Sequence, residues 1–140
     1  MSKSNVGTNE AGGLNRGFTL IELMVAVGIV AILAAIGYPS YMAQMVKGRR
    51  SSAETTLLDI AQRQQQYLLD VRGYAPDVAT LKATVPSTVS TYYTIAIAPV
   101  AGLPPPTFIA TATPIAGTTQ AGDVTLTIDN TGAKTPTSTW

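Results

Sequence analysis

Glu22 is the residue whose position most clearly suggests chemistry, because it lies alone inside a long apolar segment. It is the only charged side chain in residues 18–38, FTLIELMVAVGIVAILAAIGY. A carboxylate within an apolar span is costly, and such residues generally pair with another group and carry a function. The alternative is that Glu22 lies at the level of lipid headgroups, where the positive end of the helix dipole favours it.

Other chemistries are limited by residues that the chain lacks. Its 140 residues include no cysteine and no histidine. This excludes thiol nucleophiles, disulfides, imidazole bases and histidine-ligated metals. Asp123 and Asp129 are candidate calcium ligands, but Ca²⁺ takes about six to eight oxygens, and two such carboxylates are more often turn residues. We therefore expect no enzyme, no cofactor and no metal site.

The apolar segment is long enough to cross a membrane as a helix. Residues 18–38, each rising about 1.5 Å, span roughly 31 Å, the thickness of the hydrocarbon core. Residues 1–17 before it are polar and rich in glycine, so we expect a segment that is either disordered or a leader removed by processing. An ordinary signal peptide is the alternative, but its apolar core is shorter.

The helix is expected to continue beyond this segment. Gly37 and Pro39 weaken its middle, so a kink is expected there, and a helix end at Tyr38 is the alternative. Helical spacing then resumes, because residues 53, 57, 60, 61 and 68 are apolar and Gln64 shares their face. Arg72 followed by Gly73 indicates a C-terminus with Gly73 after the last turn. The sequence predicts one helix over about 18–70.

Residues 76–140 predict a small sheet. They hold sixteen of the twenty threonines, and short alternating runs are separated by turn residues. The runs cover 92–98, 107–113 and 124–128, and the turn at 129–132 allows a short fourth strand. Pro104–Pro106 forms a stiff connector. We expect an α+β fold in which three or four antiparallel strands pack on the C-terminal half of the helix, with Trp140 anchoring the cysteine-free end.

The junction Arg16-Gly17-Phe18-Thr19-Leu20-Ile21-Glu22, followed by an uninterrupted apolar run, resembles the processing site of type IV prepilins and pseudopilins. The order of one long helix and then a strand meander also resembles the pilin "lollipop". Gly73-Tyr74, Tyr92-Tyr93-Thr94 and Trp140 look most like PilE-type minor pilins among type IVa pilins. The missing disulfide departs from many members of that group.

The resemblance implies a processing route and a set of partners. A prepilin peptidase would cut between Gly17 and Phe18 and N-methylate Phe18, and Glu22 would then neutralise the N-terminal amine of a neighbouring subunit. Residues 18–50 would be the membrane and filament-core helix, and residues 51–140 the periplasmic head. Partners would be other pilin subunits, the inner-membrane assembly platform and, before assembly, membrane lipid. The N-terminus would be cytoplasmic, and the assembled protein would lie in the pilus at the cell surface.

Three functions stay open after this resemblance. The first is a structural subunit of a type IV pilus, a minor pilin serving twitching motility or adhesion. The second is a pseudopilin of a type II secretion or competence system, and the third is a membrane-anchored periplasmic domain that never polymerises. Residues 76–140 carry two basic and three acidic residues, which does not favour nucleic acid as a partner.

The basic residues just beyond the apolar run have two possible roles. Lys47, Arg49 and Arg50 follow it closely, as expected of residues that anchor a helix at lipid headgroups. The alternative is ion pairing between subunits of a filament, with Asp59 or Asp70 as the acidic partner.

Overall fold

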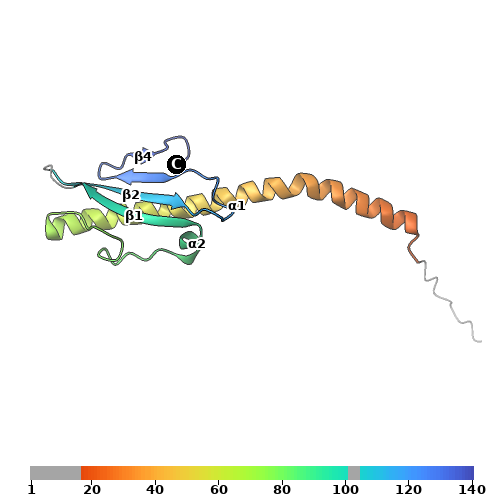
Figure 1. Cartoon of the computed structure of the whole chain (residues 1–140), viewed down its shortest axis with the longest axis horizontal. Coiled ribbons are helices and arrows are strands. Elements are labelled where there is room, and N and C mark those ends of the chain that lie inside the picture. Colours follow the sequence, from red (N-terminus) through yellow and green to blue (C-terminus); the bar gives the residue numbers. More distant parts are fainter. Residues whose placement is uncertain (1–16, 101–104) are drawn as a thin grey trace, which may run out of the picture. The chain divides into compact units, whose positions relative to one another are not determined.

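The computed structural model describes residues 17–100 and 105–140 and has an α+β fold (Figure 1). Its elements follow one another as α1 (Leu20–Val71), α2 (Ser87–Ser90), β1 (Tyr93–Val100), β2 (Thr107–Pro114), β3 (Leu126–Asp129) and β4 (Lys134–Thr135). The chain divides into two compact units between Tyr38 and Pro39. Nearly all of the expected leader, and part of the proline connector, lie outside the described residues.

The helix α1 confirms the predicted bounds to within two residues. It is a single α-helix of 52 residues with Pro39 inside it, so the alternative of a helix end at Tyr38 is wrong. A kink at Gly37 and Pro39 in an assembled filament stays a prediction.

The predicted position of the residue that ends α1, Gly73, is wrong by one residue. The N–H of Arg72 still donates to the carbonyl oxygen of Leu68 at 2.8 Å, and Arg72 itself adopts the left-handed conformation with φ 59°. The helix therefore ends one residue earlier than the Arg-Gly pattern indicates, and Arg72 takes the position that glycine usually occupies.

The four strands form one antiparallel meander in the order β1-β2-β3-β4, as predicted. Ala110 of β2 lies opposite Ile97 of β1 on one side and Ile128 of β3 on the other. The third strand begins at Leu126 rather than at Val124, and the fourth is only two residues long.

The core lies between the sheet and the C-terminal half of α1, where the green and blue strands run along the yellow-green part of the helix (Figure 1). Alternate residues of each strand face inward, and the apolar face predicted for residues 53–60 faces them. The buried apolar side chains on these elements are those of Ala53, Leu57, Ile60, Tyr93, Phe108, Ala110, Ala112, Leu126 and Ile128. This packing gives the sheet the second layer that it needs for a stable core.

Candidate functional site

The first turn of α1 holds the expected assembly residue Glu22, and the expected cleavage site, Gly17 and Phe18, lies just before the helix. Thr19 precedes the helix, and its Oγ1 accepts a hydrogen bond from the N–H of Glu22 at 3.3 Å. The carbonyl oxygen of Thr19 accepts the next bond, from Leu23 at 3.2 Å. Thr19 is thus the N-cap and Glu22 the third helical residue, which is the spacing of a capping box. The sequence analysis did not identify this cap, in which Glu22 takes part through its backbone N–H.

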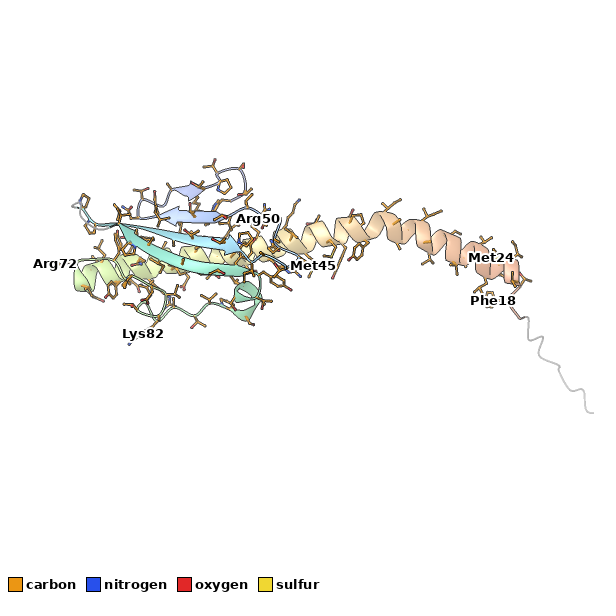
Figure 2. All side chains as sticks on the ribbon, in the orientation of Figure 1. Phe18, Met24, Met45, Arg50, Arg72 and Lys82 are labelled. Atoms are coloured by element: carbon orange, nitrogen blue, oxygen red, sulfur yellow. The ribbon has the colours of Figure 1, made fainter. Side chains whose placement is uncertain are left out.

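The apolar face beyond Glu22 is fully available for contact within this unit. Residues 20–38 contain no buried side chain, and large residues such as Phe18 just before them, Ile21 and Ile36 are between 67% and 83% exposed. Figure 2 labels Phe18 and Met24 in this part of the chain. Length and hydropathy make α1 a candidate membrane span. Contiguous apolar surface of this extent indicates contact with lipid or with other helices.

A buried polar network joins the middle of α1 to the β2–β3 loop. Arg50 pairs with the carboxylate of Asp123 through both Nε, at 3.1 Å, and Nη2. The hydroxyl of Tyr93 donates to the same carboxylate. The Asp123 side chain has no exposed surface, and that of Arg50 is 21% exposed. A buried carboxylate with two strong donors is a structural junction, because removing either charge leaves the other unpaired.

Gln120 completes this junction. Its Nε2 lies 3.1 Å from the carbonyl oxygen of Val46, 2.8 Å from the Tyr93 hydroxyl and 2.6 Å from the Asp123 carboxylate. Its Oε1 is buried with no hydrogen-bond partner in the described part of the chain. The loop is therefore held to the backbone of α1 as far back as Val46.

The network strongly perturbs two protonation equilibria. Burial alone would raise the pKa of Asp123, but hydrogen bonds from Arg50 and then Tyr93 lower it to about 2. Burial, and after it the hydrogen bond to Asp123, raises the pKa of Tyr93. Both groups therefore keep one protonation state at neutral pH, which suits a structural junction better than proton transfer.

A second buried contact holds the segment that follows the helix. The side-chain amide of Gln64 donates to the carbonyl oxygen of Ala75 and accepts from its N–H, both at 2.9 Å. The side chain thus satisfies both backbone groups of a buried residue, as a neighbouring strand would. This explains why a polar residue lies on the apolar face that the spacing predicts.

Two of the basic residues at 47–50, Arg49 and Arg50, have intramolecular partners that the sequence analysis did not foresee. Arg49 stacks on the ring of Tyr92, 3.9 Å from its centroid, and donates to Thr119 at 2.6 Å. The proposed partner Asp59 is instead bound by Arg63, four residues along the same helix, at 2.8 Å. Within one chain Arg50 is paired with Asp123, because tertiary packing brings the β2–β3 loop to α1. Ion pairing between subunits through Asp59 or Asp70 stays a prediction.

The two candidate calcium ligands lie in different local structures. Asp123 belongs to the buried junction, whereas Asp129 accepts bonds from the N–H groups of Thr131 and Ala133 in its own turn. The described residues contain no group of three or more potential metal ligands. Trp140 is partly buried against the core, and its Nε1 donates to Thr135 at 3.3 Å, which confirms it as the C-terminal anchor.

The helix cap and the buried ion pair were both missed by the sequence analysis, but only the cap has a local sequence pattern. Thr19 and Glu22 fit the spacing of a capping box, so a search for that pattern would have found the helix start. The pair of Arg50 and Asp123 is separated by 73 residues, and no local pattern joins positions so far apart.

Comparison with protein families accounts for most of the chain. Residues 39–127 match the family described as "Type IV minor pilin ComP, DNA uptake sequence receptor". Residues 14–38 match the "Prokaryotic N-terminal methylation motif". Together the two matches cover the first turn of α1, the remainder of the helix and most of the sheet.

Individual relatives agree with these families. The chain is 39% identical over 61 residues to the type IV major pilin protein PilA of Myxococcus xanthus, which covers 44% of this chain and 28% of that protein. It is 35% identical over 66 residues to the type IV wide pilus major component PilA4 of Thermus thermophilus, covering 47% and 50%.

A secretion protein matches to a similar degree. The type II secretion system core protein G of Pectobacterium carotovorum is 33% identical over 76 residues, covering 54% of this chain and 49% of that protein. The matched segments therefore span between about a quarter and a half of these relatives. No solved structure matches the chain significantly.

Proposed function

The chain belongs to the family of type IV minor pilins described as ComP, DNA uptake sequence receptor, and on this premise we propose that it is a minor subunit of a type IV pilus. It is not an enzyme in this proposal, and its activity is packing into a filament. One observation carries the proposal. The apolar part of α1, residues 20–38, has a capped start and exposed side chains, and it lies within the match to the N-terminal methylation motif.

The proposed route begins with processing at the start of this helix. Prepilin peptidase cuts between Gly17 and Phe18 and methylates Phe18, which leaves Thr19 in place to cap the helix. The single-pass protein is then held in the inner membrane with its head in the periplasm. The assembly platform next inserts it among other pilin subunits, where the charge of Glu22 pairs with the amine of a neighbour's first residue.

Intact-mass measurement of the membrane-extracted protein tests this route. We expect the mass of residues 18–140 plus one methyl group, with all of residues 1–17 removed. A mass that retains residues 1–17 would exclude both the pilus and the pseudopilin functions. It would leave the membrane-anchored domain that never polymerises.

The pilus and pseudopilin functions differ in the assembly that takes up the processed chain. The match to a type II secretion protein keeps the second function open. Isolation of surface pili separates the two, because we expect the processed chain to copurify with sheared pili. Recovery only with a secretion apparatus would favour the pseudopilin.

DNA binding is a second candidate function, and the family description supports it. The charge count that did not favour DNA binding considered residues 76–140 only. The compact unit that contains these residues starts at Pro39, and we call residues 39–140 the head unit. Residues 39–140 carry seven basic and six acidic residues. In the described residues two of these basic side chains form ion pairs, Arg50 and Arg63, and the exposed Arg72 and Lys82 are among the others (Figure 2).

The salt dependence of duplex binding tests this second function. If Arg72 and Lys82 contact phosphates, Arg72→Gln and Lys82→Gln should each weaken binding and reduce the salt slope by about one. Arg63→Gln is the matched control, because Arg63 is already paired with Asp59. Equal losses in all three variants, or no binding at low salt, would speak against DNA as a partner.

A further inference from the structure

The two edges of the sheet are protected to very different degrees. β4 forms one edge, is two residues long, includes Lys134 and is followed directly by Pro136. Short edge strands, lysine and proline are devices that stop an edge from pairing with another chain. β1 forms the other edge and is eight residues long. It has no charged residue, so it lacks most of this protection.

The absence of charge extends well beyond β1. Residues 83–122 contain no aspartate, glutamate, lysine or arginine. This segment includes both β1 and its neighbour β2. An approaching strand of the same sequence therefore meets no like charge along this edge.

The register shows which backbone groups of β1 face outward. The N–H of Ile115 donates to Tyr92 at 2.8 Å, so these two residues form a hydrogen-bonded pair. Bonded and non-bonded pairs alternate along an antiparallel ladder. The register therefore turns the N–H and C=O groups of Ile95 and Ile97 away from β2. Within the described residues, no backbone hydrogen bond joins either isoleucine to a segment outside the sheet.

Pro99 agrees with this assignment and limits the free part of the edge. Its position has the same outward orientation as Ile95 and Ile97, and proline in a sheet is confined to places where no ladder bond needs an N–H. A partner strand can therefore take ladder bonds from Ile95 and Ile97 but not from Pro99. The side chains on the outer face of this part, those of Thr94, Ala96 and Ala98, are exposed and present neither bulk nor charge to a partner strand.

We propose that β1 is a docking edge for β1 of a second copy of this chain, in antiparallel orientation. A two-fold axis through Ala96 places Ile95 of one copy opposite Ile97 of the other, and both residues then exchange N–H and C=O bonds. Ala96 faces its own equivalent, and Thr94 faces Ala98. The edge is self-complementary in hydrogen bonding, size and charge, as an isologous interface requires. This contact joins heads and is separate from packing of the apolar helices.

Single cysteines in the full-length chain test this interface, since the chain has no native cysteine. Across the proposed axis the two Ala96 Cα atoms form a non-bonded pair about 4.5 Å apart, a separation that suits a disulfide. We expect Ala96→Cys, purified in detergent and mildly oxidised, to form a covalent dimer. On a non-reducing gel, dimer formation should be at least about tenfold faster than that of a matched control.

Thr113→Cys is that control, because Thr113 is exposed on the same outer face but lies on the interior strand β2. Association of the apolar helices in micelles affects both variants equally. Equal rates for the two variants would overturn the proposal, as would a monomeric Ala96→Cys chain that instead binds a strand of another protein.

A second pair of variants keeps the test decisive if Ala96→Cys does not fold. The same axis places Thr94 opposite Ala98, so a mixture of Thr94→Cys and Ala98→Cys chains should cross-link. Each variant alone should form dimer at least about tenfold more slowly. Cross-linking of either variant alone at the rate of the mixture would contradict the register and the proposal.

Discussion

The helix of residues 20–38 and the head of residues 39–140 differ in where their burial partners come from. The head contains its own partners, including a core of alternating strand residues and a buried polar junction. The N-terminal part of α1 has no buried side chain, so its apolar surface must be covered by lipid or by other chains. The stability of the head thus depends on contacts within one chain. The environment of the N-terminal helix depends on the lipid or the other chains around it.

The carboxylates of the two regions also differ in their partners. Asp123 is inaccessible and is held by Arg50 and Tyr93 of the same chain. The backbone N–H of Glu22 donates to Thr19 Oγ1, and its carboxylate forms no ion pair with another of the described residues. Asp123 therefore has its partners within the chain, whereas in the proposed function Glu22 obtains its partner on assembly.

The largest expected effect separates the carboxylate of Glu22 from the helix cap beside it. We expect Glu22→Ala to be cut after Gly17 but to be absent from purified filaments, because in the proposed function its charge pairs with the amine of a neighbour. Thr19→Ala is the matched control: it removes the helix cap, worth about 1 kcal/mol, and keeps the carboxylate. Immunoblots of sheared pili measure incorporation. Normal incorporation of Glu22→Ala would contradict the proposed pairing, and equal loss in both variants would indicate that an intact helix start matters rather than the charge.

Two arginine–aspartate pairs provide the next contrast, within the head. Asp123→Ala should lower the free energy of unfolding by about 3–5 kcal/mol, because it leaves the Arg50 charge without its partner. Asp59→Ala, whose pair with Arg63 is 41–45% exposed, should cost at most about 1 kcal/mol. Urea unfolding of the processed chain in detergent, followed by tyrosine fluorescence, measures both. Similar losses in the two variants would contradict the junction.

The buried junction also predicts how stability depends on pH. The pKa of Asp123 is lowered from 3.8 to about 2 in the folded chain, so its stabilisation is complete above pH 3.8 and is lost as the pH falls through about 2. This difference corresponds to roughly 2 kcal/mol. Asp123→Asn should flatten the acid limb of unfolding free energy against pH. A smaller slope should remain from Asp77 and Asp129, whose pKa values are lowered by bonds within their own turns.

The smallest effect concerns the end of α1, which is one residue away from the position that the sequence indicates. Arg72→Gly should raise the unfolding free energy by up to about 1 kcal/mol, because glycine adopts φ near 59° without strain. Gly73→Ala is the control, since a Cβ there meets open space. A loss of stability in Arg72→Gly would indicate that the arginine side chain makes a stabilising contact.

Local patterns predicted most of the secondary structure. Apolar residues at helical spacing marked the helix over about 18–70, and alternating runs marked the first two strands to within one or two residues. The signal weakened where an element was short or where its end depended on one hydrogen bond. This explains the shift of the third strand to Leu126 and of the helix C-terminus to Arg72.

The sequence by itself determined the family, the apolar helix and the strand meander, because each is written in spacing and composition along a continuous stretch. Only the tertiary structure decided that Arg50 is bound by Asp123, that Gln64 holds Ala75, and that β1 is an edge with outward-facing backbone groups. These contacts join positions up to 73 residues apart. They exist because the sheet and its loops fold onto one face of the helix, and no local pattern records which distant residues then meet.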